Sequence, residues 1–262
     1  AVMSVLYALY LPNIYVSSAL LAPADQQQSN SGMLGQLSGV ASLAGISIGG
    51  ESADKSLEAI ERIRSFDFFS KYFLPEISLE DLVIVDRWDP STDTLSYENG
   101  FDATKKEWEE GSPTEQEAYE VYSDIVNLSQ DKKTFFIYLS VKHKSPNIAR
   151  DWNKIIINKI NDSMRIEDKI RANKSINFLN KESEKVNYQE IRQAISSLQE
   201  SQMKSLMLIE ANEEYIFKVI DSPIAPEKKS EPKRSLIAII GTILGFFGSS
   251  IFALVNFYFR KK

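Results

Sequence analysis

The chain has 262 residues, a net charge of -6 at pH 7 and 43% hydrophobic residues. This length suits one sizeable domain together with membrane segments. The acidic balance argues against a nucleic-acid-binding protein, which would need a basic face. The chain lacks cysteine and has His143 as its single histidine. One copy therefore cannot assemble a disulfide framework, a thiolate metal site or a multi-histidine metal site.

Residues 1–12 are predicted to be the end of a first transmembrane helix that is truncated. The run from Ala1 to Leu11 is apolar, but it is shorter than the about 20 residues that a bilayer span needs. The alternative is a buried N-terminal helix of a soluble domain. After Pro12, the stretch from Ile14 to Leu21 has the composition of a β-strand leaving the membrane.

Residues 13–144 are predicted to form an α/β base. The stretch from Ser29 to Gly50 is rich in Ser and Gly and lacks the ending of a phosphate-binding loop, so we expect a flexible or weakly helical segment. Ala53 to Ser65 is predicted to be an amphipathic helix, and Leu82 to Val85 a short strand. The apolar face of the helix consists of Leu57, Ile60 and Ile63. The aromatic residues that follow it are expected in the core: Phe66, Phe68, Phe69, Tyr72 and Phe73.

The second half of this base is predicted to contain a loop, a helix and a strand. Asp89 to Gly111 is polar, and its acidic residues are expected to be solvated surface. Ser112 is expected to cap a helix that runs to about Ser129. Thr134 to Val141 is rich in aromatic and branched residues, which indicates a strand. His143 follows and is interpreted as an ordinary surface or strand-end residue.

Residues 145–212 are predicted to form a long helical hairpin. A single straight helix over this interval would reach about 90 Å or more at 1.5 Å per residue. Its end would then lie far from the base, to which the strand predicted from Tyr215 to Ile220 must return. We expect the break at Asn187, which acts as a helix cap. One arm rises to about Lys185, and the other descends from Tyr188 to Ala211.

The apolar stripes of the two arms are thin for a unit of only two helices. The rising arm carries Ile148, Trp152, Ile155, Ile156 and Ile160, followed sparsely by Met164, Ile166, Ile170 and Phe178. The descending arm carries Ile191, Ala194, Ile195, Leu198, Leu206 and Ile209. This pattern indicates burial against neighbouring copies of the chain.

Residues 213–234 are predicted to contain the last strand of the base and a proline-rich strap. The strap includes Pro223, Pro226 and Pro232, which exclude a helix or a central strand. It is therefore expected to be a stiff, extended connection to the membrane.

Residues 235–259 are predicted to be a second transmembrane helix. No charged residue occurs from Leu236 to Phe259, and this length can cross a hydrocarbon core of about 30 Å. Basic residues flank both ends, so their distribution does not orient the helix. Small residues recur every four positions and line one face, which is typical of packing between transmembrane helices. This face consists of Gly241, Gly245, Ser249 and Ala253.

Three stretches of the chain share the pattern of one known family. They are Leu11 to Pro23, Ser42 to Gly50 and, most specifically, Glu210 to Gly245, where strap, basic pair and glycine-bearing helix occur together. The chain resembles the bacterial O-antigen chain-length determinants, the class 1 polysaccharide co-polymerases. The resemblance covers most of the chain and is weakest from Trp88 to Gln130. It implies an α+β fold that is membrane-anchored, with a periplasmic α/β base and a long protruding helical hairpin between two transmembrane helices.

The resemblance also implies a function and a location. The implied function is to regulate, without catalysis, how many repeat units are polymerised onto O-antigen. The implied partners are further copies of the chain in a ring-like homo-oligomer, the O-antigen polymerase and lipid-linked polysaccharide. The protein would lie in the bacterial inner membrane, with its bulk in the periplasm and both termini, including residues 260–262, in the cytoplasm. The chain has no Walker motif, which resembles the class without a tyrosine kinase.

Two other functions fit parts of the sequence, whereas an enzyme does not. The sequence contains no Ser/His/Asp set, metal cluster or nucleotide-binding loop, so no catalytic residue, metal or cofactor is predicted. One alternative is a membrane-anchored periplasmic adaptor or scaffold of a polysaccharide or secretion assembly. The other is a polysaccharide-binding scaffold in which Trp108 and Glu109 contact glycan.

Overall fold

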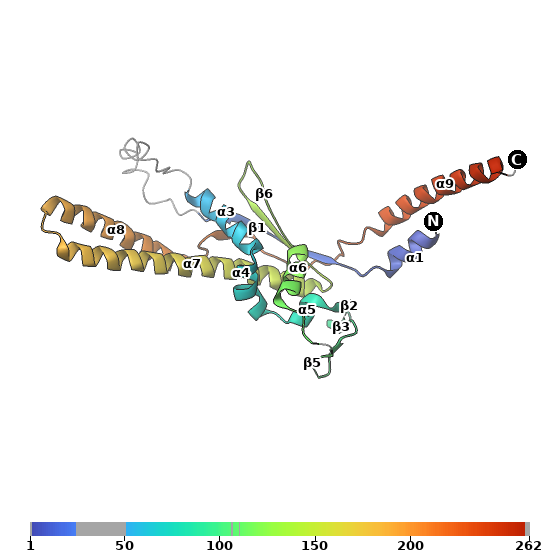
Figure 1. The fold of residues 1–262 in the computed structure, drawn as a ribbon, viewed down its shortest axis with the longest axis horizontal. Helices are drawn as coiled ribbons and strands as arrows, with labels where there is room; N and C mark the ends of the chain where they lie inside the picture. Colours follow the sequence, from blue (N-terminus) through green and yellow to red (C-terminus); the bar gives the residue numbers. More distant parts are fainter. Residues whose placement is uncertain (1, 25–50, 106, 110, 260–262) are drawn as a thin grey trace.

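The molecule is elongated, with three parts arranged along its long axis (Figure 1). The computed structural model describes residues 2–24, 51–105, 107–109 and 111–259. At one end lie the terminal helices α1 (Val2–Tyr10) and α9 (Arg234–Phe259). A sheet with surrounding helices lies in the middle. At the other end projects a hairpin of α7 (Pro146–Lys185) and α8 (Gln189–Ala211).

The middle part is built on a four-stranded antiparallel sheet in the order β6-β7-β1-β8. The strands are β1 (Tyr15–Pro23), β6 (Val126–Gln130), β7 (Ile137–His143) and β8 (Phe217–Asp221). The strands expected in the regions of β1, β7 and β8 are confirmed. Because β1 pairs with both β7 and β8, the strand after α1 and the strand before the strap are neighbours. The sheet thereby brings the two ends of the chain to the same side of the base.

One face of the sheet carries the core. In β7 the buried residues are Ile137, Leu139, Val141 and His143. Tyr138 between them is 49% exposed, as the two-residue period of a strand requires. The buried face is covered by α3 (Glu51–Arg64) and by the first half of α7. Removal of this apolar surface from water is the main favourable term in folding.

The buried face of α3 is rotated from the predicted one. Ile60 and Ile63 are buried, as expected, but Leu57 is 50% exposed. Ser56 is buried instead, because positions 56, 60 and 63 share one helical face while position 57 is turned about 100° away from position 56.

The predicted aromatic cluster folds into three short helical elements. They are α4 (Phe66–Phe68), the π-helical turn η2 (Phe69–Phe73) and the 3-10 turn η3 (Leu74–Glu76). Phe68, Phe69 and Phe73 are buried, which confirms the prediction for these residues, whereas Phe66 and Tyr72 are partly exposed. The core therefore receives three of the five aromatic rings.

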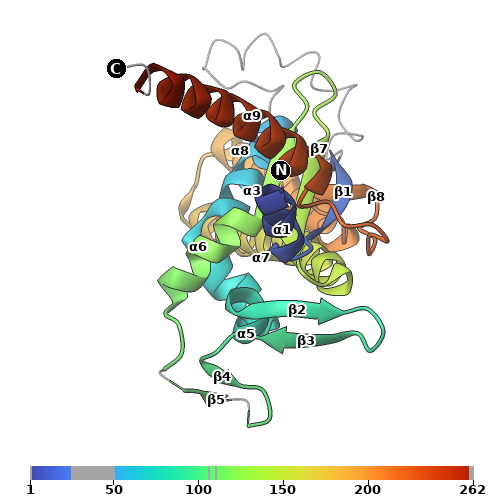
Figure 2. The same cartoon turned by 90° about the vertical axis from the view of Figure 1, so that its right-hand side faces the viewer.

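Two predictions for residues 79–111 are wrong. The expected strand at Leu82 to Val85 is not formed as one element: Leu82 and Val83 end the helix α5 (Leu79–Val83), Ile84 is its cap, and Val85 is the first residue of the next strand. The expected polar loop contains two small hairpins, β2–β3 and β4–β5, which project from the base (Figure 2). Their strands are β2 (Val85–Asp89), β3 (Thr94–Tyr97), β4 (Phe101–Asp102) and β5 (Glu107–Trp108). Aromatic pairs such as Tyr97 with Phe101 supply the apolar contacts that the polar composition concealed.

The helix predicted from Ser112 to about Ser129 is shorter at both ends. The observed helix, α6 (Glu115–Ile125), is capped by Thr114, whose backbone N–H donates to the carboxylate of Glu117 at 2.8 Å. The capping box therefore lies two residues later than predicted. The last predicted turn forms β6 instead, because its apolar residues complete the sheet beside β7.

The predicted helical hairpin is confirmed, including the ends of both arms. Ser145 caps α7. The cap residue of α8 is Tyr188 rather than the predicted Asn187, and it makes no side-chain capping bond. Near the tip, Nε2 of Gln199 donates to Oδ1 of Asn180 at 2.7 Å and connects the two arms.

The apolar segments at the two ends of the chain are helical, as α1 and α9. Within the described ranges, no helix combines the length and the apolar character needed to cross a membrane. The predicted transmembrane spans stay predictions. The predicted flexible segment from Ser29 to Gly50 and the tail 260–262 lie outside the described residues.

Candidate functional site

The hairpin is attached to the sheet through a buried asparagine of α7. Nδ2 of Asn153 donates to the carbonyl oxygens of Ser17 in β1 and Leu139 in β7, at 3.0 and 3.2 Å. Asn153 is fully buried, where a lost hydrogen bond costs more than it would at the surface. These bonds fix the helix across the two central strands.

A second asparagine of α7 attaches the hairpin to the edge strand. Nδ2 of Asn161 donates to the carbonyl oxygen of Phe217 at 3.1 Å. Its Oδ1 accepts from the backbone N–H groups of Ile216 and Phe217, at 2.8 and 2.9 Å. The sequence reasoning missed both asparagines. Their signal is a pair of amides, eight residues apart, within the apolar stripe of the helix.

A polar cluster joins α3, α7 and the segment before β8. Nζ of Lys55 lies 2.9 Å from Oδ2 of Asp168, and the hydroxyl of Tyr215 donates to the same oxygen at 2.6 Å. Burial by itself would raise the pKa of Asp168, but hydrogen bonds from Tyr215 and Lys55 lower it below its ordinary value. The cluster stabilises the point where the hairpin extends beyond the sheet.

His143 is buried, so its interpretation as a surface residue is wrong, although it does end β7. Its Nδ1 accepts from the backbone N–H of Ser145 at 2.9 Å, and its Nε2 lies 2.9 Å from the carbonyl oxygen of Asp81. Burial lowers the pKa of the imidazole, and the neutral ring with hydrogen on Nε2 satisfies both bonds. His143 therefore connects α5 to the start of α7.

The hairpin exposes large apolar side chains on both arms. On α7 these are Ile166, Ile170 and Phe178, and on α8 they include Ile191, Leu198 and Met207. Ile166 and Ile170 are four residues apart, so they lie on one side of the helix. No described residue buries this side. Isolated exposed apolar residues are ordinary, but an extended row of them indicates a contact surface.

The strap between β8 and α9 lies against β1. Of its three prolines, Pro223 is buried while Pro226 and Pro232 are partly buried. The hydroxyl of Ser17 donates to the carbonyl oxygen of Ile224 at 2.8 Å. Residues 222–230 contain no helix or strand.

The end of the strap is attached to the start of β1 and to β7. The backbone N–H of Ile14 donates to the carbonyl oxygen of Glu231 at 2.9 Å. The carboxylate of Glu231 accepts from Nζ of Lys142 at 2.9 Å. Together with the bond to Ile224, these contacts hold the entrance of α9 beside the exit of α1.

The first residue of α9 contacts the end of α1. Nε of Arg234 donates to the carbonyl oxygen of Ala8 at 2.9 Å, and its Nη2 donates to Leu11 and to Oδ1 of Asn13, at 3.3 and 3.1 Å. Nζ of Lys229 donates to the same oxygen of Asn13 at 3.0 Å. Two cations therefore share one neutral oxygen at this junction.

One residue of the predicted small-residue face lies against α1. A Cβ atom at Gly241 would be 2.3 Å from Cβ of Ser4, which is far closer than van der Waals contact permits. Gly245 is exposed, and the side chains of Ser249 and Ala253 lie outside the described part. Gly241 therefore packs against α1, a helix of the same chain.

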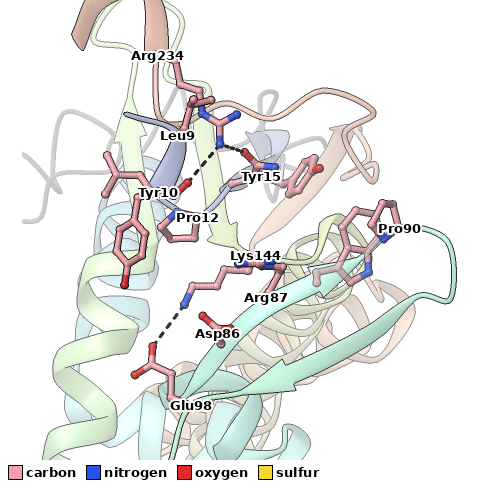
Figure 3. Close-up of a pocket in the computed structure, with 13 residues that line it drawn as sticks. Leu9, Tyr10, Pro12, Tyr15, Asp86, Arg87, Pro90, Glu98, Lys144 and Arg234 are labelled. Atoms are coloured by element: carbon pink, nitrogen blue, oxygen red, sulfur yellow. Dashed lines mark hydrogen bonds and ion pairs between the residues drawn. The ribbon is translucent and has the colours of Figure 1, made fainter. Parts of the chain in front are cut away.

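A hollow of about 720 Å³ lies where α1, the β2–β3 hairpin and the start of α9 meet (Figure 3). Its lining includes the cations Arg87, Lys144 and Arg234, the carboxylates Asp86 and Glu98, and the rings of Tyr10, Tyr15 and Trp88. Sequence reasoning did not find it, because its residues come from four separate segments.

The residues proposed for glycan contact lie elsewhere. Trp108 packs on Phe101, with ring centroids 5.2 Å apart, and Glu109 donates from its backbone N–H to Gly100 at 2.9 Å. Neither residue lines the hollow. In the described ranges, no group of three or more His, Cys, Asp or Glu residues is placed to hold a metal ion.

Comparison with known proteins gives structural similarity only. No protein-family model matches the chain, and no curated protein matches it significantly. A full-length bacterial polysaccharide co-polymerase is similar, with a TM-score of 0.40 and 11% identity over 100% of this chain and 91% of that chain. A fragment of WzzB, the polysaccharide co-polymerase from Salmonella Typhimurium, has a TM-score of 0.33 and 12% identity over 84% of this chain and 100% of that chain.

A third similar structure is a proline mutant of the Shigella flexneri lipopolysaccharide O-antigen chain-length regulator WzzBSF. Its TM-score is 0.25, with 10% identity over 83% of this chain and 100% of that chain. Two of these structures are thus described as polysaccharide co-polymerases, and the third as an O-antigen chain-length regulator.

Proposed function

We propose that the chain is a non-catalytic regulator of O-antigen chain length, acting in the bacterial inner membrane with the O-antigen polymerase. The observation that carries this proposal is the arrangement of the three parts. Two apolar helices lie together at one end of the base, and the long hairpin projects from the other end (Figure 1). A regulator of this class needs membrane attachment and a protruding surface for partners, and it needs no reacting groups.

The membrane placement is part of the proposal. The absence of charge from Leu236 to Phe259 supports an anchoring helix, and the apolar run from Ala1 to Leu11 supports a second one beside it. The contact of Arg234 with the end of α1 supports a common exit point for both helices. The base and hairpin would then lie in the periplasm, with both termini in the cytoplasm.

A homo-oligomer is also part of the proposal. The exposed apolar residues of the hairpin, such as Ile166 and Leu198, support packing between copies. Water is excluded from these side chains if a neighbouring hairpin covers them, and this burial favours association. The polymerase and the lipid-linked polysaccharide are the further partners that we infer.

Deletion of the gene tests the proposed function. We expect O-antigen still to be made, but with a random length distribution in place of a modal band on a lipopolysaccharide gel. Re-expression of the wild-type chain should restore the band. An unchanged modal band after deletion would refute the proposal. A loss of all surface polysaccharide would instead favour the alternative of an adaptor or scaffold in an export assembly.

A further inference from the structure

We propose that the hollow beside α1 and α9 binds the phosphate group of an anionic membrane lipid. The cations come from three parts of the chain: Arg87 from β2, Lys144 from the segment after β7, and Arg234 from the start of α9. A volume of about 720 Å³ is large enough for a lipid headgroup. The inference rests on the membrane placement proposed above.

The first argument is that no carboxylate of the described residues neutralises the positive charge at the Arg234 end of the hollow. Among the described residues, the side chain of Arg234 donates only to neutral oxygens, those of Ala8, Leu11 and Asn13. Lys229 donates to the same oxygen of Asn13, so the two cationic nitrogens lie within about 6 Å of each other. Like charges this close repel each other, and an anion placed between them would relieve the repulsion.

The second argument is that the side chain of Arg87 has no partner among the described residues. Among the described residues, its guanidinium group makes no ion pair and no side-chain hydrogen bond, yet it lines the hollow. Guanidinium groups form paired hydrogen bonds with phosphate oxygens. Arg87 is therefore available to a ligand without giving up a contact within the protein.

The carboxylates of the hollow lie away from Arg234. Figure 3 shows Arg234 at one end, Asp86 and Glu98 at the other, and Lys144 between them. Glu98 faces Nζ of Lys144 at 3.9 Å, which is a long ion pair. Arg87 lies beside Lys144 and Asp86 in the same view (Figure 3). The anion would consequently sit between Arg234 on one side and Arg87 with Lys144 on the other, and Asp86 would weaken its binding.

The third argument is location, and it favours a lipid over a soluble anion. Leu9, Tyr10 and Leu11 line the hollow at the end of α1, the point at which the proposed membrane helix leaves the bilayer. Tyr and Trp rings are typical of the membrane interface, and Tyr15 and Trp88 pack edge to face there with centroids 5.5 Å apart. Basic side chains at such a surface attract anionic lipids.

The test measures binding of short-chain lipids to the full chain in detergent micelles by calorimetry. Dioctanoyl phosphatidylglycerol should bind, whereas dioctanoyl phosphatidylcholine should not. Arg87→Gln should weaken binding about tenfold, the effect of one charge-assisted interaction. The matched control is Arg192→Gln, which removes the same charge from the hairpin, where Arg192 donates to the carbonyl oxygen of Val186. This control should bind as the wild type does.

A second pair of variants tests whether removal of a negative charge from the hollow strengthens lipid binding. Asp86→Asn should strengthen binding, whereas Asp124→Asn on α6 should leave it unchanged. Equal binding of the two lipids would overturn the proposal, and so would equal effects of Arg87→Gln and Arg192→Gln. Inorganic phosphate that binds as tightly as the anionic lipid would overturn the lipid as the source of the phosphate.

These outcomes are separate from those of the gene deletion. Lipid binding that depends on Arg87 would uphold the site even if the modal O-antigen band survived deletion. Conversely, a lost modal band together with no lipid discrimination would uphold the proposed function and overturn the site.

Discussion

Asn161 satisfies three backbone groups at the start of β8 with a single side chain. We expect Asn161→Ala to lower the free energy of unfolding by about 3 kcal/mol, because buried donors and acceptors are left without partners. Urea denaturation of the full chain in micelles, followed by tryptophan fluorescence, measures this. The matched control is Asn173→Ala in the same helix, whose amide donates, among the described residues, only to the carbonyl oxygen of Lys169. Equal losses for both variants would contradict the role of Asn161.

His143 should make stability depend on pH. Burial lowers its pKa in the folded protein, while the unfolded chain has the ordinary value of about 6.5. Between these two values the unfolded chain binds more protons, so the wild type should lose stability as the pH falls below about 7. The nearby charge of Lys144 acts in the same direction.

The variant His143→Gln removes this titration. We expect the stability difference between wild type and variant to shrink from pH 7.5 to pH 5.5, with a slope of at most about 1.4 kcal/mol per pH unit. Denaturation curves at a series of pH values measure the difference. Parallel pH profiles for the two proteins would show that His143 does not cause the dependence.

At the level of elements, the contact between α1 and α9 depends on the absence of a side chain at Gly241. Gly241→Ala would place Cβ 2.3 Å from Cβ of Ser4, so the two helices must move apart. Gly248→Ala meets no atom within 4 Å and should stabilise the helix, by up to about 1 kcal/mol. We expect the melting temperature in micelles to fall for Gly241→Ala and to stay equal or rise for Gly248→Ala. A rise for both would mean that α1 does not pack at Gly241.

For the whole molecule, substitutions at two residues of α8 distinguish the folding of the hairpin from the assembly of copies into an oligomer. Ile195 is 8% exposed and Leu198 is 54% exposed. Ile195→Asp should loosen the hairpin, because a carboxylate replaces a buried apolar side chain, and hydrogen exchange in both arms should accelerate. Leu198→Asp should leave exchange in the dissociated chain unchanged but reduce the oligomer mass measured by light scattering. An unchanged mass would contradict the proposed packing between copies.

The sequence by itself determined the elements that depend on local patterns. The hairpin and its ends followed from helical periodicity and from the limit on helix length, and three strands followed from their branched and aromatic residues. The apolar segments at both ends were recognisable from composition alone. Periodicity, caps and prolines act over a few residues, so they can be interpreted without knowing the fold.

Only the tertiary structure decided the features that depend on distant residues. Residues 126–130 continue the helical pattern locally, yet they form β6 because β7 offers a partner. The polar segment of Asp89 to Gly111 forms hairpins through aromatic contacts that composition does not reveal. Three features join residues that are far apart in the chain. They are the bonds of Asn161, the contact of Gly241 with Ser4, and the hollow that Arg87 and Arg234 both line. Such contacts appear only when the sheet has placed its strands side by side, because strand pairing and not sequence proximity sets these neighbours.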